Sequence, residues 1–181
     1  MKKSYILLGI LIFSLLLCAC QNKDSEYDWY KKEGIIIEES DEILEVFTPF
    51  YPNGASSLVA SCPIRLVYTN QEITYDCSVD ESYIGGLNPQ KTCTYKYNSY
   101  IYWHESNKDT QLIDYDYINI VLKDNDNIIG FAVVVIKHIG NYVYSSSILK
   151  SVIFPKVDGK YQNITSEQIN RFIDECKDKN K

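Results

Sequence analysis

The sequence predicts an α+β fold in which an antiparallel, curved sheet packs against one C-terminal amphipathic helix. Three observations support this prediction: an apolar hairpin in the second half of the chain, a β-prone aromatic run before it, and helical periodicity near the C-terminus. Strands that follow one another across short polar turns favour antiparallel pairing, because parallel strands need long crossover connections.

The hairpin joins residues 117–122 to residues 128–136 through a polar turn, Asp124-Asn125-Asp126-Asn127. Asn and Asp tolerate the left-handed backbone that such turns require. Residues 128–136 are apolar on both faces, which predicts a central strand that is covered on both sides. A turn at Gly140 then leads into a third strand over residues 142–154.

The C-terminal helix is predicted from its cap and its apolar stripe. Thr165 and Gln168 have the spacing of a capping box, in which each side chain bonds the other residue's backbone. The stripe repeats at helical spacing and comprises Ile169, Phe172, Ile173 and Cys176. We expect this helix to cover one side of the central strand.

The first half of the chain predicts shorter elements. A strand is expected at residues 35–37, and a short helix beginning at Asp41. Residues 64–68 and 73–79 are predicted to pair as a hairpin, and residues 92–104 to form one long strand.

The N-terminus combines two lysines, Lys2 and Lys3, with an almost wholly apolar run over residues 5–17 and the sequence Leu17-Cys18-Ala19-Cys20. A charged start, an apolar run and a small-residue cleavage site are typical of a signal peptide. The last four residues resemble the lipobox of bacterial lipoproteins. An uncleaved membrane helix is the alternative, although the run is shorter than the roughly 20 residues that span a bilayer.

The resemblance implies that a thioether links diacylglycerol to Cys20 and that a signal peptidase cuts before it. Residues 1–19 would then be a cleaved signal, residues 20–33 the lipidated cysteine with a polar tether, and residues 34–181 a single domain. The expected location is the extracytoplasmic side of a membrane in the cell envelope, with the acyl chains holding the protein there.

The charge of the mature chain argues against nucleic acid as a partner. Loss of residues 1–19 removes two lysines and no acidic residue, so the formal net charge changes from −6 to −8. Such a chain repels phosphate backbones.

Four cysteines remain beside Cys20, namely Cys62, Cys77, Cys93 and Cys176. An even number in an exported chain indicates disulfides, and four cysteines allow three pairings. Cys62 and Cys77 are the first candidate pair, because the predicted hairpin would place Cys77 opposite Ile64. The alternative is that these cysteines are reduced and buried.

No metal or cofactor is predicted. The two histidines, His104 and His138, share no ligand-type spacing with each other or with the cysteines. The turn at residues 124–127 lacks the glycine and glutamate of an EF-hand calcium loop. Asp114 and Asp116 are interpreted as solvated charges at the start of a strand.

One enzymatic alternative rests on Tyr75-Asp76-Cys77-Ser78, which resembles the Asp-Cys-Ser core of NlpC/P60 cell-wall peptidases. The segment beginning at His138 loosely resembles the histidine strand of that family. The resemblance implies that Cys77 is a nucleophile and His138 its base. The chain departs from the family after Ser78, where acidic residues replace glycine and an apolar helix.

Seven aromatic residues gather in sequence: Tyr95, Tyr97, Tyr100, Tyr102, Trp103, Tyr115 and Tyr117. On strands, aromatic side chains pack in cores or across strand pairs, or form an exposed platform for a sugar or a protein. The sequence therefore predicts a binding or accessory module, not an enzyme, with an envelope protein or a glycan as its ligand.

Overall fold

The computed structural model describes residues 29–50, 60–68, 72–85, 90–105, 114–140 and 143–180. The chain divides into two compact units, one ending at Gly34 and the other beginning at Ile35. In the first unit the described residues form a short helix, α2 (Trp29–Lys32), followed by Gly34 with a positive φ of 74°. The predicted lipobox, cleavage site and most of the tether precede residue 29 and lie outside the described residues.

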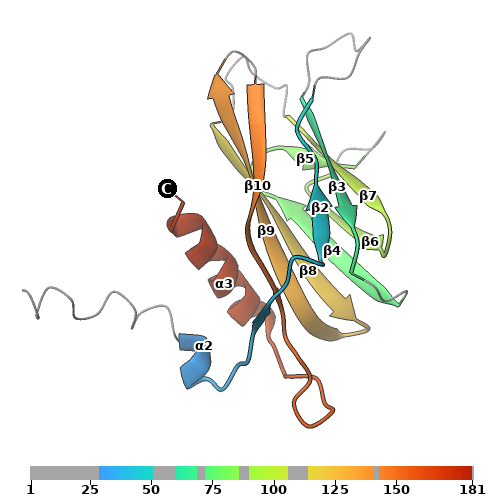
Figure 1. The fold of residues 1–181 in the computed structure, drawn as a ribbon, viewed down its shortest axis with the longest axis vertical. Helices are drawn as coiled ribbons and strands as arrows, with labels where there is room; N and C mark the ends of the chain where they lie inside the picture. Colours follow the sequence, from blue (N-terminus) through green and yellow to red (C-terminus); the bar gives the residue numbers. More distant parts are fainter. Residues whose placement is uncertain are drawn as a thin grey trace, which may run out of the picture. The chain divides into compact units, whose positions relative to one another are not determined.

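In its described residues the second unit contains two antiparallel sheets (Figure 1). Sheet A has the strand order β1 (Glu38–Glu39), β10 (Val143–Ile153), β9 (Asn127–Gly140), β8 (Tyr115–Asp124), β4 (Ile73–Val79) and β6 (Thr92–Lys96). Sheet B has the order β2 (Leu44–Val46), β3 (Ser61–Leu66), β7 (Tyr100–His104) and β5 (Tyr83–Ile84).

One apolar core joins the two sheets. Alternate residues of β3 and β7 in sheet B, such as Ile64 and Ile101, belong to the same buried cluster as Ile120 and Val134 of sheet A. Period-two alternation explains this arrangement, since each strand buries one face. The sheets therefore form a sandwich, which the sequence prediction of one sheet did not foresee.

Helix α3 (Ser166–Asp178) lies on the side of sheet A that faces away from sheet B (Figure 1). Its Phe172 packs against Phe131 of β9 and Phe154, with ring centroids 5.3 Å and 5.9 Å away. The capping box is present, because the Thr165 hydroxyl accepts from the Gln168 backbone and the Gln168 side chain accepts from the Thr165 backbone. An α+β fold with a C-terminal helix on an antiparallel sheet is confirmed; the predicted curvature stays a prediction.

The hairpin of β8 and β9 is also confirmed. Asp124 and Asn127 are paired at its end, and Asn125 has the positive φ of 52° expected in such a turn. β9 lies between β8 and β10, and its residues 128–136 are all buried. The prediction of a central strand covered on both sides is therefore right.

Two local predictions are wrong. Residues expected in a helix after Asp41 form strand β2, where Leu44 is buried and Glu45 is exposed, because pairing with β3 decides the conformation. No strand forms at residues 35–37, where the Gln162 side-chain amide bonds both backbone groups of Ile36.

The predictions of a hairpin at residues 64–79 and of one long strand at residues 92–104 are wrong as well. Strand β4 has the predicted bounds and β3 overlaps the predicted residues 64–68, but the two strands lie in different sheets and contribute to the same core. This removes the hairpin on which the Cys62–Cys77 pairing rests. Residues 92–104 form two strands, because the chain turns at Asn98, with φ of 59°, and passes from sheet A to sheet B.

A buried carboxylate connects the sheets. Asp116 of β8 is 1% exposed, and among the described residues it accepts hydrogen bonds from four donors. These are the backbone N–H groups of Glu81 (2.9 Å), Ser82 (3.1 Å) and Tyr117 (2.9 Å), and the indole Nε1 of Trp103 (2.6 Å). Such donors offset the cost of removing a charge from water. The interpretation of Asp116 as a solvated charge is therefore wrong.

We predict that Asp116→Asn lowers the free energy of unfolding by roughly 2–4 kcal/mol. Each carboxylate oxygen accepts from two of the four donors, so the NH₂ group of asparagine leaves two of them without their acceptor, whichever oxygen it replaces. Urea unfolding followed by circular dichroism measures the change. Asp114→Asn is the matched control, since Asp114 is exposed. Equal unfolding midpoints for the two variants would contradict the role of Asp116.

Candidate binding surface

The outer face of sheet B carries a continuous set of exposed or half-buried rings. Strand β7 turns Tyr100, Tyr102 and His104 outward, while Ile101 and Trp103 are fully buried in the core. Strand alternation enforces this division, because successive side chains point to opposite faces. We call the outward set, together with its neighbours Phe47 and Tyr83, the aromatic row.

Each ring of the aromatic row contacts the next. The Tyr100 centroid lies 6.5 Å from that of Tyr102, which lies 6.3 Å from His104, and both pairs are nearly parallel. Phe47 extends the row beyond Tyr100 at 6.2 Å, and Tyr83 beyond His104 at 5.3 Å. Tyr100 and Tyr102 are 46% and 39% exposed, so a ligand can reach the middle of the row.

Polar groups border the row on β3. Arg65 lies directly opposite Tyr100 in the strand register. Its guanidinium forms an ion pair with Glu45 at 3.4 Å and donates to the side-chain oxygen of Asn98 at 3.2 Å. The edge of the row therefore offers donors and acceptors, while the Arg65–Glu45 pair itself carries no net charge.

His104 is held within the row by a backbone contact. Its Nε2 donates to the carbonyl oxygen of Gly85 at 2.8 Å, and its ring stacks between Tyr83 and Tyr102. Burial lowers the pKa of His104 below the ordinary value of 6.5, although the hydrogen bond to Gly85 works in the opposite direction. The imidazole is therefore neutral at neutral pH and acts as an aromatic surface.

The predicted aromatic cluster is divided between the sheets. Tyr100 and Tyr102 are exposed on sheet B, whereas Tyr115 is exposed on sheet A beside Lys137. The others are buried or partly buried: Tyr95, Tyr97, Trp103 and Tyr117.

Three members of the row were missed by the sequence prediction. His104 continues the alternation of Tyr100 and Tyr102, a signal that the sequence contains. Phe47 and Tyr83 join the row only through the pairing of separate strands and their flanks in sheet B. No local pattern identifies them.

The structure does not bring the candidate nucleophile and base together. Cys77 lies opposite Ile120 of β8, which lies opposite Ala132 of β9. His138 is farther along β9 by about 20 Å, at the usual rise of a strand. Burial also raises the pKa of the Cys77 thiol, which disfavours the nucleophilic thiolate.

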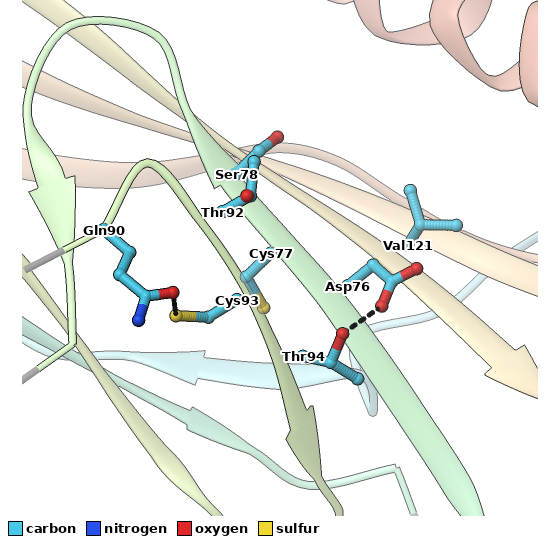
Figure 2. Close-up of a pocket in the computed structure, with 8 residues that line it drawn as sticks. All are labelled: Asp76, Cys77, Ser78, Gln90, Thr92, Cys93, Thr94 and Val121. Carbon is cyan, nitrogen blue, oxygen red and sulfur yellow. Dashed lines mark hydrogen bonds between the residues drawn. The ribbon is translucent and has the colours of Figure 1, made fainter.

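A separate pocket of about 520 Å³ lies at β4, β6 and β8 (Figure 2). Its lining residues are Asp76, Cys77, Ser78, Gln90, Thr92, Cys93, Thr94 and Val121. The Asp76 carboxylate accepts from the Thr94 hydroxyl at 2.8 Å and pairs with Lys123. These groups satisfy one another, so the pocket presents little unpaired charge to a ligand.

Within the described ranges, no three His, Cys, Asp or Glu side chains gather as metal ligands. The helices of those ranges are too short or too polar to cross a membrane. A scan against protein-family models finds no match, and neither a search of curated proteins nor a search of solved structures finds one.

We predict that His104 makes stability fall on acidification. Because its folded pKa lies below 6.5, its stabilising contribution is complete above about pH 6.5 and declines as the pH falls towards the folded value. Urea unfolding at about pH 7.5 and about pH 5.5 measures the decline. His104→Gln should show a smaller decline than wild type, and His138→Gln should retain it. An equal decline in wild type and His104→Gln would refute the prediction.

Proposed function

We propose that the protein is a lipid-anchored, extracytoplasmic binding module whose aromatic row takes an uncharged glycan. The observation that supports the binding role is the row itself. Rings from Phe47, Tyr83 and β7 form one accessible surface on a sheet whose opposite face supplies the core. Exposed aromatic surface of this kind is typical of ligand contact, because its burial on binding is favourable.

The chemistry of the row favours a glycan. Ring faces pack against the C–H faces of a sugar, and the tyrosine hydroxyls provide polar contacts at the ring edge. Arg65 and Asn98 add a donor and an acceptor beside Tyr100. The acidic chain would repel an anionic polymer, which favours a ligand without charge.

The anchor is supported by residues 1–20. The charged start, the apolar run and the Leu17-Cys18-Ala19-Cys20 sequence agree with export and lipidation at Cys20. Two or more acyl chains hold a protein stably on a membrane, whereas one does so marginally. A role in binding without catalysis is supported by the separation of Cys77 from His138.

For the anchor, we predict that the membrane-extracted chain has the intact mass of residues 20–181 plus diacylglycerol. Cys20→Ser should abolish lipid attachment, because serine lacks the sulfur that forms the thioether. Cys18→Ser is the matched control and should retain the lipid, since serine is also small. A full-length chain without lipid would refute the anchor.

For the ligand surface, we predict that Tyr100→Ala and Tyr102→Ala each weaken glycan binding about tenfold, or about 1.4 kcal/mol. Isothermal titration with neutral oligosaccharides selected on an array measures the affinity. Tyr115→Ala is the control, because Tyr115 is equally exposed but lies on sheet A. Thermal unfolding of all three variants should stay close to wild type.

Two outcomes would contradict this proposal. Unchanged affinity in both row variants would place the glycan elsewhere on the protein. The protein could instead bind a purified envelope protein and no oligosaccharide, and lose that binding in the row variants. This result would support the aromatic row as the binding site but refute a glycan as its ligand.

A further inference from the structure

We propose that Cys77 and Cys93 form a disulfide that joins β4 to the edge strand β6. The two residues are direct partners in the antiparallel register of these strands. Directly opposed side chains point to the same face of a sheet. Here that face is the core side, where Cys77 is 1% exposed and Cys93 is partly buried against the core. The inference does not depend on the ligand of the aromatic row.

The backbone spacing at this pair is close to that of a disulfide. The Val79 N–H donates to the Lys91 carbonyl at 3.0 Å, two residues along from the cysteines on each strand. Hydrogen-bonded pairs recur at every second position, so Cys77 and Cys93 occupy such a pair, with Cα atoms about 5.5 Å apart. Disulfides join Cα atoms about 4.4–6.8 Å apart and Cβ atoms about 3.5–4.5 Å apart. The Cβ atoms of a hydrogen-bonded pair are about 5.5 Å apart, so formation of the bond draws the edge strand β6 towards β4 by about 1 Å.

The two sulfurs are turned to different acceptors in the reduced form, and the Cys77 sulfur donates to the Tyr75 carbonyl at 3.8 Å. The Cys93 sulfur donates to the Gln90 side-chain oxygen at 3.2 Å, and Figure 2 shows it turned towards Gln90. Cys93 is only partly buried, so a small reagent can reach its sulfur, whereas Cys77 is buried. Rotation of the two side chains gives up one hydrogen bond to an exposed amide and one long S–H contact, which is a small cost.

The other described cysteines are poorly placed as partners. Cys62 lies in sheet B opposite Trp103, and its sulfur donates to the Phe47 carbonyl at 3.1 Å. Facing sheets are about 10 Å apart, beyond the reach of about 7 Å that a disulfide bridges between Cα atoms. Cys176 is on α3, which packs on the opposite side of sheet A from the core that contains Cys77.

The reaction is a thiol–disulfide exchange with an external disulfide. The Cys93 thiolate attacks one sulfur of the reagent, forms a mixed disulfide and releases one reagent thiolate. The Cys77 thiolate then attacks the Cys93 sulfur and releases the second. Two protein thiols are oxidised, one reagent disulfide is reduced to two thiols, and the two protons pass to the departing thiolates. The raised pKa of Cys77 makes the second step slow.

The test uses the full chain, extracted from membranes in detergent and incubated with oxidised glutathione. Iodoacetamide in denaturant, without reductant, then marks all remaining thiols, including the buried ones, and peptide mass mapping locates them. We expect a cross-linked peptide pair that contains Cys77 and Cys93, with Cys62 and Cys176 in thiol form. Reduction should lower the melting temperature by roughly 5–10 °C.

Cysteine variants show whether the effect of oxidation comes from the Cys77–Cys93 bond or from oxidation at other cysteines. Cys93→Ser and Cys77→Ala should each abolish the cross-link and the redox dependence of melting, whereas Cys176→Ser should leave both unchanged. The peptide map of the wild-type protein can overturn the proposal by itself. The test therefore does not depend on whether the variants fold. Alkylation of both cysteines after oxidation, a stable glutathione adduct on Cys93, or a cross-link to Cys62 or Cys176 would overturn it.

Discussion

The packing of the two sheets depends on one buried charge, the carboxylate of Asp116. Its donors come from the segment before β5, from β7 and from β8, so one side chain connects sheet A with the strand that bears the aromatic row. An apolar residue at this position would leave those donors without an acceptor inside the protein, at a cost of about 1–3 kcal/mol each. The interaction is directional, because each oxygen of Asp116 accepts from two donors at fixed positions on the backbone and on Trp103.

Local patterns predicted the elements that depend on near neighbours. The β8–β9 hairpin followed from its polar turn and its apolar strands, and α3 followed from the Thr165–Gln168 cap. The second sheet was not predictable in the same way, since β3 and β4 have similar alternation and nothing local says whether they pair or face each other. The break at Asn98 was equally hidden, because residues on both sides favour strands.

The candidate surface was also predictable only in part. The alternation of Tyr100 and Tyr102 with Ile101 and Trp103 was visible in the sequence, but which face would remain in solvent was not. In the structure Ile101 and Trp103 face the core, where the Trp103 indole donates to Asp116, a partner that is distant in the sequence. The register that brings Cys93 opposite Cys77 likewise depends on which strands become neighbours, a non-local property.

Strand β7 has a consequence for how this protein can change. Its inward residues, Ile101 and Trp103, belong to the core, whereas Tyr100 and Tyr102 point outward and are largely exposed. Substitutions of these two tyrosines therefore change the chemistry of the surface at little cost in folding free energy. The strand is a scaffold on which new specificities can arise, by natural variation or by design, without repacking the interior.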